Sequence, residues 1–401
     1  MIGTRNAKDV IFTPTAAALW LVTFLGYAHQ GLLQPIIPLY LKNLGHSELL
    51  IGFALAAFSV TSFSLRPLIG YFTDDWSVVG VLALGVLILG LGAAGLLVPV
   101  LWVIFVTNAV RGIGWAALNT AGATLLAHIA PAARRAEAAG YLNMFQSAST
   151  AISGPLALWL VGLARLSAAS FNVVFAVAAG TGLLAAAVAR GIASPPIAAR
   201  ARPRPVYSRL RALSGMLDRD VALPMFLQAC LILSYPALIS FVVLYAQRLG
   251  LSQTSVIWYF LANGLTAVGT RLALGRVQDR IDRGLSTAIG FAIVMAAIVV
   301  MLNATTEVQL VAAGACYAAG YSLAGAGLTA LAIDMANPLR RGAAMATYSM
   351  ANQLGSGIGA ALSGAIIQAA GYRAMYLTVL VPPAVALGTL WFARRRIAAA
   401  G

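Results

Sequence analysis

The sequence predicts an all-α membrane protein with twelve transmembrane helices in two pseudo-symmetric six-helix bundles. Composition is the first reason: of 401 residues, 61% are hydrophobic and 9% are charged, and the mean hydropathy is +0.88. A soluble domain carries roughly 25% charged residues, so a soluble enzyme is excluded. The second reason is that the apolar residues form long continuous runs. The third is that the two halves of the chain repeat each other.

Twelve apolar runs are long enough to cross a bilayer, which takes about 18 residues or more. They lack the alternation of apolar and polar residues that marks the strands of an outer-membrane barrel. The predicted spans are 15–41, 49–70, 78–98, 101–129, 136–163, 169–189, 221–247, 254–275, 285–303, 309–335, 343–370 and 374–393. The third and fourth spans are nearly contiguous, which leaves eleven as the alternative count.

The distribution of basic residues predicts the orientation of the chain. Nearly all of the 26 Lys and Arg residues lie in alternate connections or at the span ends beside them. The exceptions are Lys42, Arg165, Arg248, Arg373 and the intramembrane Arg111. Because cytoplasmic loops retain Lys and Arg, we expect both termini in the cytoplasm and an even number of spans. The net charge of +15 therefore reflects topology, and we expect no nucleic-acid partner.

One long connection, rich in Arg and Pro, divides the chain into its two halves. The predicted parts are a cytoplasmic N-terminus (1–14), a first bundle (15–189), a cytoplasmic linker (190–220), a second bundle (221–393) and a cytoplasmic tail (394–401). We interpret the linker as a solvated segment whose arginines contact anionic lipid.

The two halves match at an offset of roughly 205 residues. The first and seventh spans end in the matched pairs Leu44-Gly45 and Leu249-Gly250. The second and eighth spans close with two triplets of identical spacing, namely Arg66, Gly70 and Asp74 and then Arg271, Gly275 and Asp279. Such a repetition of rare positions in the same order indicates duplication of a six-span unit.

This pattern resembles the major facilitator superfamily. Six spans plus six, a long central loop and an Arg-x-x-x-Gly-x-x-x-Asp motif after spans two and eight are typical of that family. The resemblance implies a secondary transporter that works by alternating access between two bundles. It also implies a cytoplasmic latch made of Arg66, Gly70, Asp74, Arg271, Gly275, Asp279 and Arg280. Static pairing within the loops is the alternative role of these groups.

The fifth span contains Gly154 and Pro155, which resemble the Gly-Pro motif of exporters in this family. The resemblance thus implies the drug and metabolite efflux branch, in which the substrate leaves in exchange for protons. The sequence has no Gly-x-x-x-x-Gly-Lys-Ser/Thr loop, so we expect neither ATP-driven transport by this chain nor an enzyme. We expect a monomer in the inner membrane of a bacterial cell. Its partners would be a small-molecule substrate, protons and membrane lipid, without a metal or cofactor.

Polar side chains inside the predicted spans indicate a substrate cavity. Such a side chain is costly unless it faces the bundle interior or an aqueous space. The predicted cavity residues are Tyr27, Gln30, Gln34, Asn108, Arg111, Asn119, Asn143, Gln146, Tyr235, Asn352 and Gln353. For the polar residues of spans five and eleven, namely Asn143, Gln146, Asn352 and Gln353, hydrogen bonding between helices is the alternative role.

Arg111 and His29 are the candidates for proton coupling. Arg111 lies deep in the fourth span, and no acidic residue lies at mid-depth in any predicted span. Its partners are then backbone carbonyls, side-chain amides or a substrate anion, and a structural hydrogen-bond hub is the alternative role. His29 is the mid-membrane side chain that titrates nearest to neutral pH. It is therefore a candidate proton carrier, or else a neutral and hydrogen-bonded histidine.

These observations leave four functions open. The first is export of a small organic compound in exchange for protons. The second is export of an anionic metabolite, siderophore or metallophore, which Arg111 favours. The third is facilitated diffusion or import of a neutral solute, which the lack of a mid-membrane carboxylate favours. The fourth is a membrane receptor without transport activity.

Overall fold

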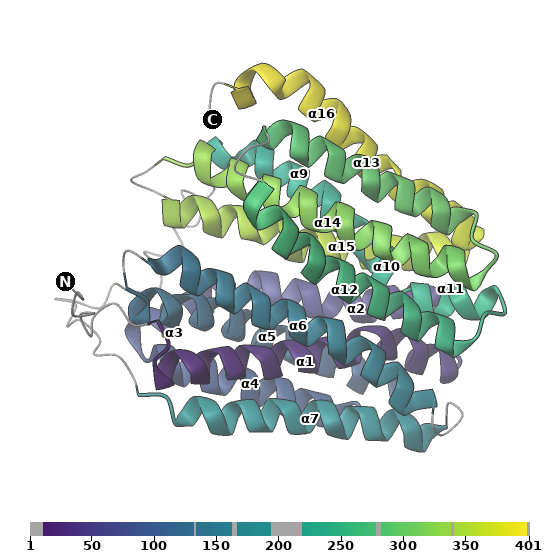
Figure 1. The fold of residues 1–401 in the computed structure, drawn as a ribbon. Helices are drawn as coiled ribbons and strands as arrows, with labels where there is room; N and C mark the ends of the chain where they lie inside the picture. Colours follow the sequence, from purple (N-terminus) through teal and green to yellow (C-terminus); the bar gives the residue numbers. More distant parts are fainter. Residues whose placement is uncertain are drawn as a thin grey trace.

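The computed structural model describes residues 11–131, 134–162, 167–193, 219–277, 282–337 and 341–398, and within them all regular structure is helical. The first half contains α1 (Pro14–Asn43), α2 (Glu48–Ser64), α3 (Arg66–Asp75), α4 (Val78–Gly95), α5 (Leu101–Ile129), α6 (Arg135–Gly162) and α7 (Ala168–Arg190). The second contains η4 (Arg219–Val221), α9 (Ala222–Leu233), α10 (Tyr235–Ile239), α11 (Val242–Arg248), α12 (Gln253–Val277), α13 (Arg283–Leu302), α14 (Glu307–Met335), α15 (Arg341–Val379) and α16 (Val381–Ala398). The halves lie side by side, with their helices along one common direction (Figure 1).

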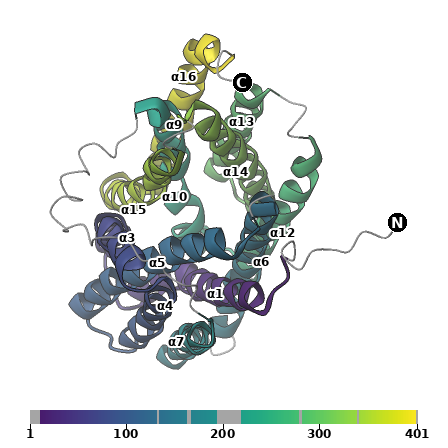
Figure 2. The same ribbon diagram turned by 90° about the vertical axis from the view of Figure 1, so that its left-hand side faces the viewer.

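Both ends of the described chain lie at one face of the molecule. α1 begins there and α16 ends there (Figure 1), and Figure 2 looks onto this face. We call it the terminal face, and the opposite face, where α11 ends, the distal face. Most of the predicted linker lies outside the described residues. The basic residues predict that the terminal face is cytoplasmic.

The two halves use the same turn after spans one and seven, as the duplication predicts. Gly45 and Gly250 have φ angles of 84° and 71°, in the left-handed region that favours glycine. The Gly45 amide donates to the Lys42 carbonyl, and the Gly250 amide donates to the Gln247 carbonyl, both at 3.0 Å. A left-handed glycine that satisfies the last carbonyls of a helix is a common helix ending.

Matched glycines also set the helix spacing in both halves. A Cβ added at Gly114 of α5 would lie 2.5 Å from the Gly85 carbonyl oxygen of α4. A Cβ added at Gly320 of α14 would lie 2.7 Å from the Gly290 carbonyl oxygen of α13. Small residues allow membrane helices to approach this closely. The duplication therefore extends to the packing of individual helices.

Several predicted spans are interrupted rather than straight. The second consists of α2 and α3, which meet at a bend of 43°. Pro67, in the first turn of α3, disfavours continuous helix through the residue before it. The seventh consists of α9, α10 and α11. The eleventh and twelfth are joined in α15, where Gly371 has a non-helical conformation with φ of 81°.

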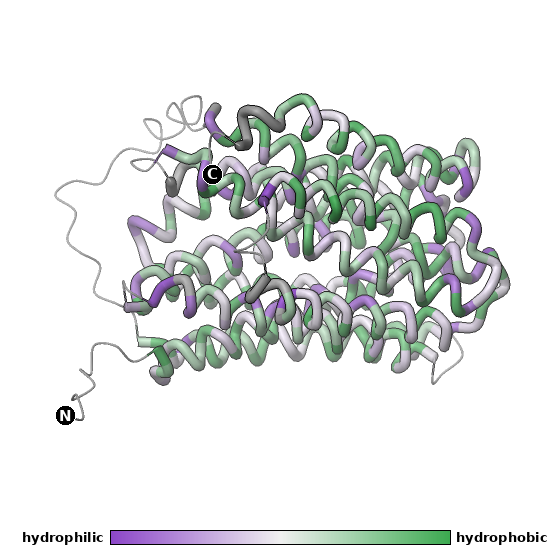
Figure 3. Tube along the Cα trace, turned by 45° about the horizontal axis from the view of Figure 1, so that its top comes forward, coloured by the Kyte–Doolittle hydropathy of each residue, from purple (hydrophilic) through white to green (hydrophobic). Residues whose placement is uncertain are grey.

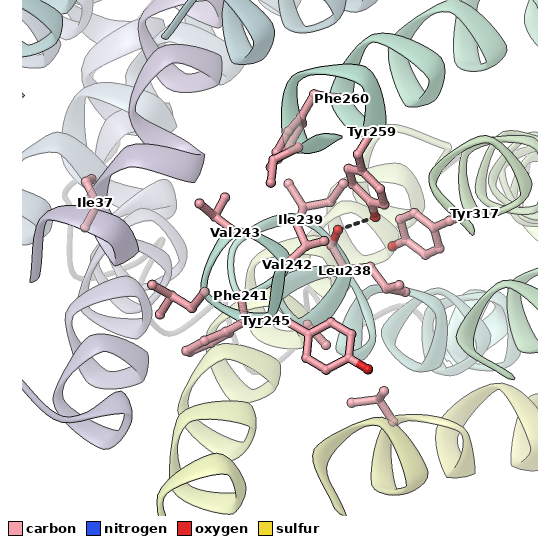
Figure 4. Packing of buried hydrophobic residues seen from close by; sticks show 14 of the residues in the cluster. Ile37, Leu238, Ile239, Phe241, Val242, Val243, Tyr245, Tyr259, Phe260 and Tyr317 are labelled. Atoms are coloured by element: carbon pink, nitrogen blue, oxygen red, sulfur yellow. Dashed lines mark hydrogen bonds between the residues drawn. The ribbon is translucent and has the colours of Figure 1, made fainter. Parts of the chain in front are cut away.

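Tyrosines from other helices hold the interrupted seventh span. The Tyr259 hydroxyl of α12 donates to the Leu238 carbonyl (Figure 4), and the Tyr376 hydroxyl of α15 donates to the Ala237 carbonyl at 3.4 Å. Both tyrosines are fully buried. A polar backbone group beside a helix break is costly in apolar surroundings unless it is hydrogen-bonded. The two hydroxyls therefore stabilise α10, which has five residues.

Eight helices in the described part of the chain are long and apolar enough to cross a membrane, and the bent pair α2 and α3 makes a ninth. α6 and α12 fall short because polar residues, such as Gln146 and Asn263, lie along them. Thr347–Ala393 counts as one stretch, although Gly371 divides it. Hydrophobic residues run along the helices, and hydrophilic segments gather toward their ends (Figure 3). The chain is a multi-pass membrane protein, and twelve crossings remain a prediction.

The two halves pack backbone against backbone near the distal face. A Cβ added at Gly52 of α2 would lie 2.5 Å from the Ala360 carbonyl oxygen of α15. Across the same boundary, the Gln253 amide of α12 donates to the Leu158 carbonyl of α6 at 2.6 Å. A side chain cannot fit between α2 and α15 at this distance. The halves are therefore closed against each other on the distal side.

Replacing Gly52 by Val will destabilise this closed arrangement. The new side chain meets the backbone of the other half, and such overpacking costs about 1–3 kcal/mol. We expect a lower thermal unfolding temperature in detergent than for the wild type. Gly269→Val is the matched control, because nothing lies within 4 Å of a Cβ at that position. Equal unfolding temperatures of the two variants would contradict the distal closure.

Candidate substrate cavity

A cavity of about 400 Å³ lies between the two halves. Residues of α1, α2, α3, α5 and α6 border it from the first half, and residues of α9, α10, α12, α14 and α15 border it from the second. Of the residues predicted to line a substrate cavity, all but Asn143 border this one: Tyr27, Gln30, Gln34, Asn108, Arg111, Asn119, Gln146, Tyr235, Asn352 and Gln353. Substrate contact by these residues remains a prediction.

Arg111 of α5 is 1% exposed and has an unusual set of partners. Its Nε donates to Nε2 of His29 at 3.1 Å, and its two terminal nitrogens donate to Oδ1 of Asn108 at 2.7 Å and to Oε1 of Gln30 at 2.9 Å. The Phe58 ring centroid lies 5.4 Å from the guanidinium carbon. None of these partners carries a negative charge. Each nitrogen of the guanidinium has a hydrogen-bond partner, whereas no residue in the described part of the chain forms an ion pair with it.

Local sequence explains how α5 can hold this side chain. Asn108 precedes Arg111 by three residues, so both lie on one face of the helix. Gly92 of α4 provides the space, because a Cβ there would lie 2.5 Å from Cγ of Arg111. A larger residue at that position would collide with the arginine stem.

His29 is neutral in this arrangement. Its Nδ1 lies 2.9 Å from the Ala178 carbonyl oxygen of α7, which can only accept, so Nδ1 carries a proton. The Nε of Arg111 can only donate, so Nε2 of His29 is the unprotonated acceptor. His29 is fully buried and acts on the cavity through Arg111 rather than bordering it. Its role as a proton carrier remains a prediction.

The cavity is bordered by three arginines: Arg66 at the start of α3, Arg111 in α5 and Arg271 in α12. Among the described residues that border it there is no Asp, Glu, Lys or His. A poorly solvated interior screens charge less than water does. The three guanidinium groups therefore give this cavity a positive potential.

Arg66 and Arg271 each reach from one half to the other. Arg66 donates to the Ser349 hydroxyl of α15 at 2.9 Å, and Arg271 donates to the Ser147 hydroxyl of α6. The two arginines are equivalent in the internal repeat. The sequence predicted them as latch residues at span ends. In the structure they also border the cavity, which the repeat alone did not indicate.

Several buried donors at the cavity wall have no hydrogen-bond partner. Within the described part of the chain they include Nε of Arg66, Nδ2 of Asn108 and the hydroxyl of Ser322. Unpartnered buried donors are costly and uncommon in folded proteins. All three atoms are buried in this conformation, so an oxygen atom of a ligand can reach them only when neighbouring side chains move.

Asn143 borders a second cavity, of about 500 Å³, between α1, α5 and α6. The two cavities share Tyr27, Asn119 and Gln146. The second one reaches Arg135, at the start of α6 on the terminal face. The space therefore continues from the centre of the molecule toward the terminal face, whereas the distal side is closed.

Three of the remaining predicted latch residues lie in described helices, Gly70 and Asp74 in α3 and Gly275 in α12. Asp74 is exposed on α3, and nothing lies within 4 Å of a Cβ added at Gly70. Gly275 lies near the end of α12, whereas Asp279 and Arg280 lie outside the described residues. A latch formed by these groups remains a prediction.

Gly154 and Pro155, the exporter-type motif, lie inside α6 where this helix meets α12. Gly154 borders the cavity, and a Cβ there would lie 3.3 Å from the Phe260 ring of α12. The motif thus lies on the boundary between the two halves. Its bearing on transport direction remains a prediction.

Tyr27 and Tyr235 were predicted from the sequence, but the rest of the aromatic lining was not. Phe58 and Phe260 border it, as does Trp115, whose ring centroid lies 4.6 Å from that of Tyr27. In an apolar helix nothing distinguishes a phenylalanine that packs from one that faces a cavity. Asn263 of α12 also borders it, and its polarity in mid-span was a usable signal.

The sequence profile of the Major Facilitator Superfamily matches residues 19–308 and 285–400 of the chain. A search of curated proteins by sequence gave no match.

Solved structures of transporters share the fold at low sequence identity. A bacterial homologue of the human lysosomal transporter Spinster, inward-facing and unoccupied, has a TM-score of 0.77 at 14% identity over 99% of each chain. The nucleoside transporter NupG, solved as a mutant, has a TM-score of 0.73 at 15% identity over 94% of this chain and 99% of its own. The human organic anion transporter MFSD10 has a TM-score of 0.66 at 17% identity over 94% of this chain and 99% of its own.

At these identities the structural likeness establishes the fold alone. The family profile, by contrast, covers nearly the whole chain. From the profile and the fold together we conclude that this chain belongs to the Major Facilitator Superfamily and is a transporter, not an enzyme.

Proposed function

We propose that this transporter exports a small organic anion by alternating access between its two halves. The observation that carries the proposal is the charge of the central cavity. Three arginines border this cavity, and none of the described residues that border it is an Asp or Glu. Ionisable groups inside the membrane are expensive and commonly mark a substrate or ion pathway. A bound anion would supply the counter-charge that Arg111 lacks.

The other cavity residues support an organic anion over an inorganic one. Aromatic rings from both halves, including Phe58, Trp115 and Tyr235, provide apolar contact area beside the arginines. Ligand sites commonly combine such a lining with a few polar groups that orient the ligand. Unpartnered donors at Asn108 and Ser322 add hydrogen bonds to a carboxylate or phosphate once neighbouring side chains move. A neutral solute would leave the positive charges unbalanced.

The arrangement of the two halves supports alternating access. The interface is closed on the distal side, and the cavity space continues toward the terminal face. With twelve spans and cytoplasmic termini in a bacterial inner membrane, as the sequence predicts, this is the inward-open state in which an exporter binds its substrate. The Gly154-Pro155 motif favours export over import.

Transport into proteoliposomes tests the substrate class. Labelled organic carboxylates are compared with their neutral amides, and we expect the wild type to transport the carboxylates. Arg111→Ala will reduce that transport at least about tenfold, because a buried charge-assisted hydrogen bond is worth more than 1.4 kcal/mol. Arg111→Lys will recover only part of it, since an ammonium group lacks the planar fork of the guanidinium.

Arg248→Ala is the control for that measurement, because Arg248 is exposed at the end of α11 and does not border the cavity. Equal transport of amides and carboxylates by the wild type would contradict the anion proposal. Full carboxylate transport by Arg111→Ala would assign Arg111 a purely structural role.

Exchange for protons is the second part of the proposal, with His29 as the carrier. A proton on Nε2 of His29 would remove the acceptor of Arg111 and place a second positive charge beside it. Protonation of His29 and the Arg111–His29 hydrogen bond therefore exclude each other. Uptake of a proton would release Arg111 from this contact, which links the proton to the residue that holds the anion.

His29→Gln will separate proton coupling from structure. A glutamine amide can donate to the Ala178 carbonyl and accept from Arg111, yet it does not titrate. We expect carboxylate transport by the wild type to respond to an imposed pH gradient and transport by His29→Gln to continue without that response. The measurement is the transport rate in proteoliposomes with and without the gradient. An indifferent wild type, or a variant with the full response, would rule out His29 as the carrier.

A further inference from the structure

We infer that Arg66 and Arg271 form a second anion subsite, which binds one acidic group of a substrate that carries two. This inference rests on the proposed transport of an organic anion and narrows the substrate to a dianion.

The arginines form two separate groups in the cavity wall. Arg111 is engaged by His29, Asn108 and Gln30. Arg66 and Arg271 have other partners and border the same cavity as Tyr27. Arg271 also donates to the carbonyl of Asn143, which borders the cavity that reaches the terminal face. Tyr27 is also one of the residues shared with the cavity that reaches the terminal face. The second group thus lies on the terminal side of the site.

Neither arginine of the second group is ion-paired with a described residue. Arg66 donates to the Ser349 hydroxyl, and its buried Nε has no partner. Arg271 donates to the Ser147 hydroxyl and, at 3.5 Å, to the Asn143 carbonyl oxygen. Neutral oxygens are weaker partners for guanidinium than carboxylate or phosphate oxygens. Both arginines can therefore form stronger hydrogen bonds by exchanging their present contacts for an anion.

The two arginines also come from opposite halves. Arg66 belongs to the first half and Arg271 to the second, and two like charges on the wall of one cavity repel each other. An anion between them would remove this repulsion and join the halves by charge-assisted bonds on the terminal side. A substrate with two acidic groups would then occupy Arg111 with one group and bring the halves together with the other.

Binding of matched mono- and dicarboxylates tests the subsite. The probes are α,ω-dicarboxylates from succinate to suberate, each paired with the monocarboxylate of equal length, titrated calorimetrically against the purified transporter in detergent. We expect the best dicarboxylate to bind at least about tenfold more tightly than its partner. Arg66→Ala and Arg271→Ala will each abolish that preference, because Arg111 then remains as the one complete site for an acidic group.

Further variants separate the subsite from a static fastening of the two halves. Ser349→Ala and Ser147→Ala remove the hydroxyls that the arginines hold, and we expect both to retain the dicarboxylate preference. Arg190→Ala, at the exposed end of α7, is the control for loss of a positive charge on the terminal face. Arg66→Gln and Arg271→Gln replace the alanine variants if these do not fold, with the same expected loss of preference.

The outcomes distinguish this inference from the proposed function. Equal binding of mono- and dicarboxylates by the wild type would overturn the subsite and leave anion transport standing. An unchanged dicarboxylate preference in the Arg66 and Arg271 variants would also overturn the subsite alone. So would loss of the dicarboxylate preference in the Ser349 and Ser147 variants. Failure of every carboxylate to bind the wild type would overturn the proposed function and the subsite with it.

Discussion

A buried guanidinium with only neutral partners is the constraint on which the centre of this transporter depends. An unpaired charge in a membrane interior is costly, so its surroundings must satisfy every donor and leave it space. The chain does this with Gly92, which provides room, and with His29, whose neutral tautomer is fixed by the Ala178 carbonyl. What these residues do not supply is a negative charge. Each nitrogen of the Arg111 guanidinium therefore has a hydrogen-bond partner but no negative charge from these residues, and a ligand anion would supply that charge.

The internal duplication explains how the helices pack, whereas positions at which the two halves differ explain the lining of the cavity. Glycine turns and glycine contacts between helices are matched in both halves. In the register of Gly114 and Gly320, the residue that corresponds to Arg111 is Tyr317, which also borders the cavity. The first half thus presents a charge where the second presents an aromatic ring. An organic anion in the cavity would therefore meet the Arg111 guanidinium from the first half and the Tyr317 ring from the second.

The sequence predicted those features that the cost of polarity in a membrane determines. Apolar runs located the helices, and polar residues within them, such as Gln30 and Asn352, located the cavity, because such side chains must face inward. The orientation of Arg66 and Arg271 could not be predicted, since a long basic side chain near a span end can extend either to the lipid headgroups or into the protein. Phe58 and Phe260 carried no signal either, because an apolar ring fits both lipid and cavity. The break before α10 has a local signal in Pro236, whereas the hydrogen bonds that hold α10 come from distant helices, which local sequence does not contain.

The interrupted seventh span determines how α10, which forms part of the cavity wall, can move. α10 has five residues, too few for a helix that is stable by itself. Its carbonyls are held by hydroxyls of α12 and α15, while Tyr235 at its start donates across the boundary to Gln34 of α1 at 3.2 Å. The position of α10 is therefore set by α12 and α15, which hold its carbonyls, rather than by α10 itself. A tilt of α12 and α15 relative to the first half would carry α10 with them and draw Tyr235 away from Gln34, so opening on this side would need no separate lid.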